Sequence, residues 1–182
     1  MSAAVALCRR PGITVDEVRR ALIRDRDEFS AIAALAADPD EPAGARVVAL
    51  AAVVEACAVC DLGVPEVLAD AVDDLALVDA ALVRGQPGAV IAALIGLGAR
   101  ADLATTRRRV VRRLVAAGAT GLPLAGLAIA IGDVDAGVAL AVRDHDRHVA
   151  GRGDDPIVRA WRAWLAAQPE HARRAIESRL ER

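Results

Sequence analysis

The sequence predicts an all-α protein of about ten short helices, and three observations carry this prediction. Apolar residues recur at three- and four-residue spacing along most of the chain, as in helices that bury one face. Gly and Pro mark short loops between these stretches, and alternating strand-like runs are almost absent. The 182 residues suit one domain over 1–182, with the loops at 38–42 and 151–155 as alternative points of division.

The first helix signal is a capping box from Thr14 to Glu17, in which the two side chains satisfy amides that a helix start leaves unpaired. A helix is therefore expected to run to about Arg24. Asp27 is expected to cap a second helix, because a carboxylate accepts hydrogen bonds from the amides of a first turn. That helix ends before the Pro- and acid-rich loop at 38–42.

Residues 43–62 form a long apolar stretch followed by Gly63, a residue that accepts the left-handed conformation of a helix end. Over 64–84, Leu and Val recur at helical spacing and most acidic residues lie off that stripe. This pattern predicts one amphipathic helix ended by Gly85. The same signals predict six further helices: about 87–98, 102–117, 121–131, 134–149, 156–167 and from Pro169 onward.

Ala, Val and Leu dominate the 55% of hydrophobic residues, whereas the aromatic residues are limited to Phe29, Trp161 and Trp164. Helices in such a core must approach one another closely, because small side chains leave little bulk between backbones. All 23 basic residues are arginine, which we interpret as the codon bias of a high-GC bacterial genome. The odd number of cysteines and the lack of a secretory leader predict a cytoplasmic protein.

The uncharged stretch from Leu114 to Gly132 follows a basic run, the arrangement that the positive-inside rule associates with a membrane span. The stretch is rich in alanine, is interrupted by Gly and Pro, and has no flanking aromatic belt. A helix that is buried on all sides explains the same residues, so no membrane span is expected.

Chains of short helices with brief turns form either an orthogonal bundle or an α-solenoid. The loop at 38–42, the apolar helix after it and the segment from Gly63 to Leu68 together resemble one HEAT-type repeat. The segment from Asp154 to Trp161 resembles the start of another repeat. The resemblance covers about a third of the chain and implies a HEAT-like helical repeat protein.

The C-terminal segment from Ile157 to Glu170 is similar to the closing repeat of HEAT-like alkylpurine DNA glycosylases, in which a Trp-bearing helix precedes a helix begun by proline. This resemblance implies DNA held on a basic concave face, with Trp161 or Trp164 as the aromatic residue near the lesion. By helical spacing alone, the two tryptophans share one face and suit a hydrophobic cap on the core.

Two pairs of metal-ligating residues point to a candidate zinc site. Cys57 and Cys60 are three residues apart, as are His145 and His148, so the members of each pair share a helix face. Two thiolates and two imidazoles suffice for tetrahedral zinc, the one cofactor for which the sequence offers ligands. The alternative is a pair of small buried cysteines and a pair of solvated histidines, with no cofactor.

The strongest charge feature is an arginine run at 107–113, within a chain whose two halves differ in sign. Residues 1–91 carry a net charge of −7 and residues 92–182 a net charge of +5. On a helix, Val110, Val111 and Leu114 would turn inward. The candidate residues for binding a partner or a phosphate are Arg107, Arg108, Arg109, Arg112 and Arg113. The alternatives are pairing with the acidic N-terminal half and a merely solvated face with some intramolecular ion pairs.

These features predict a non-catalytic protein-interaction or scaffold module whose partner is an acidic protein or a second copy of the chain. One alternative is a HEAT-like DNA-binding protein, related to DNA glycosylases, that uses the same arginines on nucleic acid. Another is a small-ligand binder or enzyme with a cavity among the helices expected at 87–98 and 121–131. No phosphate loop or nucleophile elbow occurs in the sequence, so no catalytic residue is predicted.

Overall fold

The computed structural model describes residues 3–98, 100–119, 124, 127, 165–166 and 169–180. The chain forms two compact units, Met1–Thr106 and Arg107–Arg182, and each is described by itself. Over the described ranges the backbone forms helices and turns and no strand, which confirms the all-α prediction. The expectation of a single 182-residue domain stays a prediction.

Most of the described helices belong to the first unit. In chain order they are α1 (Ala3–Cys8), α2 (Val15–Arg24), the 3-10 helix η1 (Arg26–Glu28), α3 (Phe29–Ala37), α4 (Ala43–Cys60), α5 (Leu68–Asp73), α6 (Leu75–Val83), α7 (Pro87–Gly96) and the 3-10 helix η2 (Ala101–Leu103). Helix α8 (Ala104–Ala116) crosses the boundary between the units, and α12 (Glu170–Leu180) lies in the second unit. The sequence analysis did not anticipate α1.

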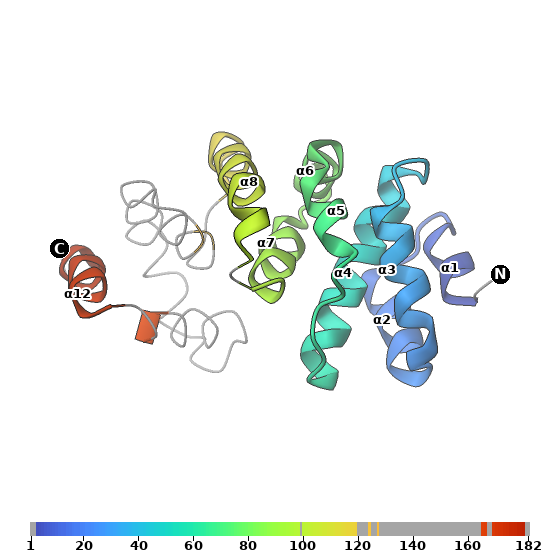
Figure 1. The fold of residues 1–182 in the computed structure, drawn as a ribbon. Coiled ribbons are helices and arrows are strands. Elements are labelled where there is room, and N and C mark those ends of the chain that lie inside the picture. Colours follow the sequence, from blue (N-terminus) through green and yellow to red (C-terminus); the bar gives the residue numbers. More distant parts are fainter. Residues whose placement is uncertain are drawn as a thin grey trace. The chain divides into compact units, whose positions relative to one another are not determined.

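Helix α4 is the central element of the first unit. It contacts α2 and α3, which precede it in the chain, and α6 and α7, which follow it. Figure 1 shows α4 between these two pairs of helices. Twelve of its 18 residues are buried, and most of them are Ala or Val. These small buried side chains are consistent with the expected close packing of helices, because small side chains allow short distances between helix axes.

Helix α4 is also, by length and composition alone, long and apolar enough to cross a membrane. Of its 18-residue apolar window, 67% is buried inside the protein. The core helix of a globular protein meets the same criterion, so this feature of α4 carries no conclusion about a membrane.

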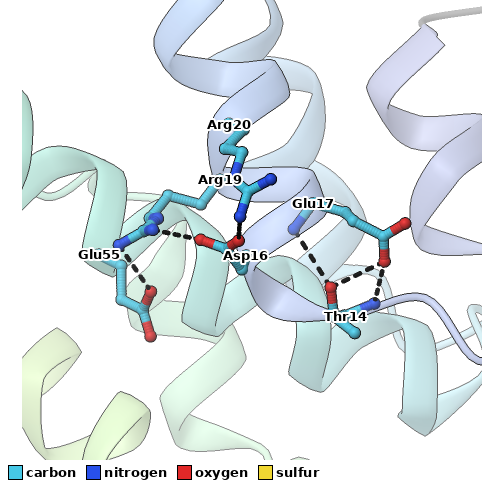
Figure 2. Close-up of polar contacts among 6 residues, drawn as sticks. All are labelled: Thr14, Asp16, Glu17, Arg19, Arg20 and Glu55. Atoms are coloured by element: carbon cyan, nitrogen blue, oxygen red, sulfur yellow. Dashed lines mark hydrogen bonds and ion pairs between the residues drawn. The ribbon is translucent and has the colours of Figure 1, made fainter.

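The predicted capping box at the start of α2 is confirmed, and Figure 2 shows its hydrogen bonds. The Glu17 amide donates to Thr14 Oγ1 at 3.3 Å, and the Thr14 amide donates to Glu17 Oε2 at 3.0 Å. The Thr14 hydroxyl donates to the same carboxylate at 2.7 Å. These hydrogen bonds hold the pKa of Glu17 below its usual range.

Polar contacts also join the exposed edges of α2 and α4. Arg19 contacts Asp16 one turn earlier in α2, and its Nη1 lies 3.7 Å from Oε2 of Glu55 on α4 (Figure 2). Surface ion pairs of this kind contribute about 0–1 kcal/mol each. The main contribution to packing therefore comes from Val18 and Leu22, which are fully buried on the inner side of α2.

The prediction that Asp27 caps the second helix is wrong. The carboxylate of Asp25 instead accepts a hydrogen bond from the Asp27 amide at 3.2 Å, and this contact starts the 3-10 helix η1. Helix α3 then begins at Phe29 with no side-chain cap and ends, as expected, before the loop at 38–42. Because η1 precedes α3, the regular α-helix begins at Phe29, two residues after Asp27.

The end of α4 also differs from the prediction. The helix stops at Cys60, and Asp61 rather than Gly63 adopts the left-handed conformation, with φ at 54°. The amide of Leu62 donates to the carbonyl oxygen of Cys57 at 2.9 Å. This is the 6→1 hydrogen bond of a Schellman motif, in which the donor lies five residues after the acceptor. Aspartate tolerates this conformation because its short polar side chain can form local hydrogen bonds.

The single helix expected over 64–84 is two helices, α5 and α6, with a break at Asp74. The backbone of Asp74 is extended, and its Oδ1 accepts a hydrogen bond from the Ala76 amide at 2.9 Å. Asp74 therefore ends α5 and caps α6. Hydrophobic spacing continues across the break, which is why the periodicity of the sequence alone predicts one helix.

The remaining predicted boundaries fall close to the observed ones. Gly85, Gly98 and Gly118 each have a positive φ just after α6, α7 and α8, as expected for helix ends. The last predicted helix is present as α12, which begins one residue after Pro169. The helices expected at 121–131, 134–149 and 156–167 lie outside the described residues, apart from helical positions at 124, 127, 165 and 166.

Candidate functional site

The arginine run lies on α8, where helical spacing separates a buried side from an exposed side. Val110, Val111 and Leu114 are fully buried, as the sequence predicts. Four arginines are exposed, and together they form what we call the arginine face: Arg108, Arg109, Arg112 and Arg113.

Arg107 does not belong to the arginine face. The residue is 7% exposed, and it interacts within the protein. Its position explains the difference, because Arg107 precedes Val111 by four residues and Leu114 by seven and so shares their side of the helix. The run of arginines in the sequence predicts one group of five, and burial separates Arg107 from the other four.

Within the arginine face, Arg108 and Arg112 are the most available for a partner. Neither forms an ion pair with any residue in the part of the chain that the structure describes. The two are four residues apart, so their guanidinium groups lie about one helical turn from each other. Like charges at this spacing destabilise a helix by about 0.2–0.5 kcal/mol, a penalty that an acidic partner would remove.

Of the acidic residues within 64–84, Asp73 and Asp74 make specific contacts within the first unit. The Thr106 hydroxyl donates to Asp73 Oδ1 at 2.6 Å, which joins the start of α8 to the end of α5. Arg46 Nη1 donates to Asp74 Oδ2 at 2.7 Å. These two carboxylates are therefore part of the internal structure of the first unit.

Arg46 is a residue that the sequence analysis missed. Its side chain is 4% exposed, and its Nε donates to the carbonyl oxygen of Ala36 at 3.1 Å, near the end of α3. With the Asp74 contact, Arg46 joins α3, α4 and the start of α6. Its Nη2 is buried and has no hydrogen-bond partner among the described residues. The available signal was an arginine within an Ala- and Val-rich helix, where a charge requires a partner.

The electrostatics of Asp74 reflect two opposing effects. Burial alone would raise the pKa of its carboxyl group, because desolvation disfavours the charged form. Hydrogen bonds from Arg46 and from the Ala76 amide outweigh burial and hold the pKa of Asp74 below its usual range. The carboxylate is therefore stabilised in its charged form where it caps α6 and pairs with Arg46.

A second group of charges surrounds Arg100, between α7 and η2. Arg100 Nη2 lies 2.7 Å from Asp102 Oδ2, and its Nη1 lies 4.0 Å from Glu66 Oε1. Asp102, followed by Glu66 and Asp70, raises the pKa of Arg100. The Glu66 side chain is 91% exposed and that of Asp102 is 59% exposed. The exposed carboxylates of Glu66 and Asp70 therefore add negative charge to the surface beside the Arg100–Asp102 pair.

The candidate zinc ligands are only partly within the described residues. Cys57 is 2% exposed, and its thiol donates to the carbonyl oxygen of Gly63 at 3.5 Å, whereas Cys60 is half-buried. Burial, with a smaller contribution from Cys60, raises the pKa of Cys57, which disfavours the thiolate that zinc requires. Among the described residues, no group of three or more His, Cys, Asp or Glu side chains could hold a metal ion.

Other predicted site residues lie outside the described residues: His145, His148, Trp161 and Trp164. The zinc site and the aromatic contact implied by the glycosylase resemblance therefore stay predictions. The cavity expected among the helices at 87–98 and 121–131 does so as well, because most of the second segment is not described.

Comparison with protein-family models, curated protein sequences and solved structures finds no match for this chain. The HEAT-like resemblance is neither supported nor contradicted by this result. What the fold and the site define is a class: an all-α protein with a basic face on α8 and an acidic surface around Arg100.

Proposed function

We propose that the protein is a non-catalytic helical interaction module that binds an acidic protein surface through the arginine face of α8. The observation that carries this proposal is the exposure of Arg108 and Arg112 one turn apart, without an ion pair in the described part of the chain. The opposite side of the helix is anchored by Val110, Val111 and Leu114, so the arginine side is held in a fixed orientation.

The chemistry of the guanidinium group favours carboxylate partners. Arginine presents a planar fork of donors that matches both oxygens of a carboxylate, and it remains charged at any physiological pH. Exposed ion pairs contribute about 0.2–1 kcal/mol each, so the face supplies orientation and a fast association rate more than high affinity. A reversible, salt-sensitive complex is the expected result.

Contacts within the first unit support a repeat-like scaffold for this surface. Besides several consecutive pairs, helices contact their second neighbours along the chain: α1 with α3, α2 with α4, α3 with α5, α4 with α6 and α5 with α7. Helix α4 also contacts its third neighbours α1 and α7. Stacked helical repeats have this pattern, and they commonly bind partners on the surface that the stack presents. The proposal of a HEAT-like helical repeat protein rests on this pattern and on the sequence resemblance.

The proposal is tested by fluorescence anisotropy with a labelled helical peptide carrying glutamate at every fourth position. We expect wild-type protein to bind it at about 50 mM salt and to release it as salt rises, because screening weakens exposed pairs. Arg108→Ala with Arg112→Ala should weaken binding by about 2–30-fold, as expected for two lost contacts.

The matched control is Arg20→Ala with Arg24→Ala, which removes two exposed arginines at the same spacing from α2. Binding by this control should be unchanged. Equal losses in both variants would mean that only net charge matters and would contradict the proposal. Tighter binding to duplex DNA of matched charge, lost in the α8 variant, would favour the nucleic-acid alternative.

A further inference from the structure

We propose that the acidic partner of the arginine face is a second copy of this chain, bound through the surface formed by Glu66, Asp70 and Asp102, which we call the acidic surface. This inference rests on the proposed function and names the partner. Three features of the described residues lead to it: the spacing of the acidic residues, their exposure, and the distribution of charge between the two units.

The spacing of Glu66 and Asp70 matches that of Arg108 and Arg112. A turn at Pro65 leads directly into α5, because the amide of Ala69 donates to the Glu66 carbonyl oxygen at 2.9 Å and the amide of Asp70 to that of Val67 at 3.2 Å. Glu66 and Asp70 are therefore four residues apart on consecutive turns of the chain, and both carboxylates act on the same guanidinium, that of Arg100. Two pairs of opposite charge with equal spacing can meet side by side.

Two carboxylates of the acidic surface, Glu66 and Asp70, are open to solvent. The Glu66 side chain is 91% exposed, and its contact with Arg100, at 4.0 Å, is at the limit of an ion pair. Asp70 is exposed on the next turn. Because Glu66 and Asp70 are exposed and Glu66 has only a long contact with Arg100, further guanidinium groups would be attracted to these two carboxylates.

The two units carry opposite net charges. The unit Met1–Thr106 contains nine arginines and 16 acidic residues, whereas Arg107–Arg182 contains 14 arginines and nine acidic residues. The resulting net charges are −7 and +5. Attraction between the acidic unit of one copy and the basic unit of another would steer the two surfaces together over about a Debye length.

Each copy carries one arginine face and one acidic surface. In a two-fold dimer the contact between an arginine face and an acidic surface would form twice, once at each of two symmetric places. If the rotation between successive copies does not return to the first copy, the same contact links the copies into an open filament. Either assembly is held by exposed charges and should dissociate at high salt.

The test is sedimentation equilibrium of the full chain and of two charge-reversed variants. Wild type should associate with rising concentration at about 20 mM salt and be monomeric at about 500 mM. Variant one, Arg108→Glu with Arg112→Glu, and variant two, Glu66→Arg with Asp70→Arg, should each be monomeric, because each then presents like charges on both surfaces.

The decisive step is to mix the two variants. Variant one offers two acidic surfaces and variant two offers two basic ones, so both contacts of a dimer become attractive in the mixture. We expect a 1:1 complex with a dissociation constant within about 5-fold of the wild-type value. A merely structural effect of either substitution would not be reversed by adding the other variant.

Controls keep the test informative. Arg20→Glu with Arg24→Glu makes the same charge change on α2 and should leave association unchanged. If a charge-reversed variant loses its helical circular dichroism, the neutral changes Arg108→Gln with Arg112→Gln and Glu66→Gln with Asp70→Asn replace it, and each should weaken association at least 5-fold.

Two outcomes would overturn the inference: a wild-type chain that stays monomeric at low salt, or a mixture of variants that does not associate. In the first case, retained binding of the acidic peptide by Arg108 and Arg112 would leave the proposed function standing. The two ideas therefore fail separately.

Discussion

Arginine serves two opposite purposes in this protein, and Arg46 of α4 and Arg112 of α8 illustrate them. Arg46 is the one arginine of a long apolar helix, and its side chain is 4% exposed. It donates hydrogen bonds both to the carbonyl oxygen of Ala36 and to the carboxylate of Asp74. Arg112 is exposed and forms no ion pair within the described residues. The difference teaches that the surroundings of an arginine, and not its charge alone, decide whether it stabilises the fold or remains available to a partner.

The physical reason lies in desolvation. Removing a guanidinium from water is unfavourable by several kcal/mol, so Arg46 is tolerated in the core only because fixed acceptors replace the lost hydration. Arg108 and Arg112 keep their hydration, and a partner that binds them displaces loosely held water. Arg46 should therefore matter for stability and the α8 pair for binding.

The largest expected effect is on stability and comes from Arg46→Met, which removes the donor to Ala36 and Asp74. We expect a loss of about 2–4 kcal/mol in the free energy of unfolding, measured by urea denaturation. This is less than a fully buried pair would lose, because the Asp74 side chain remains 29% exposed and can be hydrated. The exposed Arg24→Met is the control, and a comparable loss there would remove the contrast.

A second prediction concerns pH and Asp74, whose pKa is lowered in the folded protein. Because the folded pKa is below the unfolded value of about 3.9, the stabilisation is complete above about pH 4 and is lost as pH falls through the folded pKa. The unfolding free energy of wild type should therefore decrease more steeply between about pH 4 and pH 2 than that of Asp74→Asn. Parallel curves for the two proteins would contradict the role of the Arg46 contact.

The smallest expected effect is that of Arg108→Ala with Arg112→Ala on stability. Loss of two exposed side chains without partners should change the free energy of unfolding by less than about 0.5 kcal/mol. Relief of like-charge repulsion could even raise it slightly. Urea denaturation beside the Arg46 variant measures this directly, and a loss above about 1 kcal/mol would show that the arginine face belongs to the internal structure.

The fold was predictable from the sequence to the extent that it depends on near neighbours. The capping box of Thr14 and Glu17 involves residues three apart, and the glycines after α6, α7 and α8 end those helices through their own backbone freedom. The orientation of Val110 and its neighbours on α8 follows from helical spacing in the same way. Two local predictions were wrong even so. Asp25 rather than Asp27 accepts the capping hydrogen bond, and Asp61 rather than Gly63 adopts the left-handed conformation after α4.

The candidate site was predictable in part. Four of the five arginines proposed from the run at 107–113 are exposed, whereas Arg107 belongs to the buried side of α8. The acidic surface was visible only as a scatter of carboxylates, because its members come from α5, from the turn before it and from η2. Their convergence on Arg100 depends on how these elements pack.

The sequence by itself determined the helical class, most helix boundaries within the described residues and the basic side of α8, because these depend on interactions within about four residues. Only the tertiary structure decided that Asp74 breaks an otherwise continuous helix and that Arg46 belongs to the core. Those two residues are 28 positions apart, and nothing in the local pattern of either indicates the other. Contacts of that range form when helices pack, since packing alone brings a buried donor to the one carboxylate that can satisfy it.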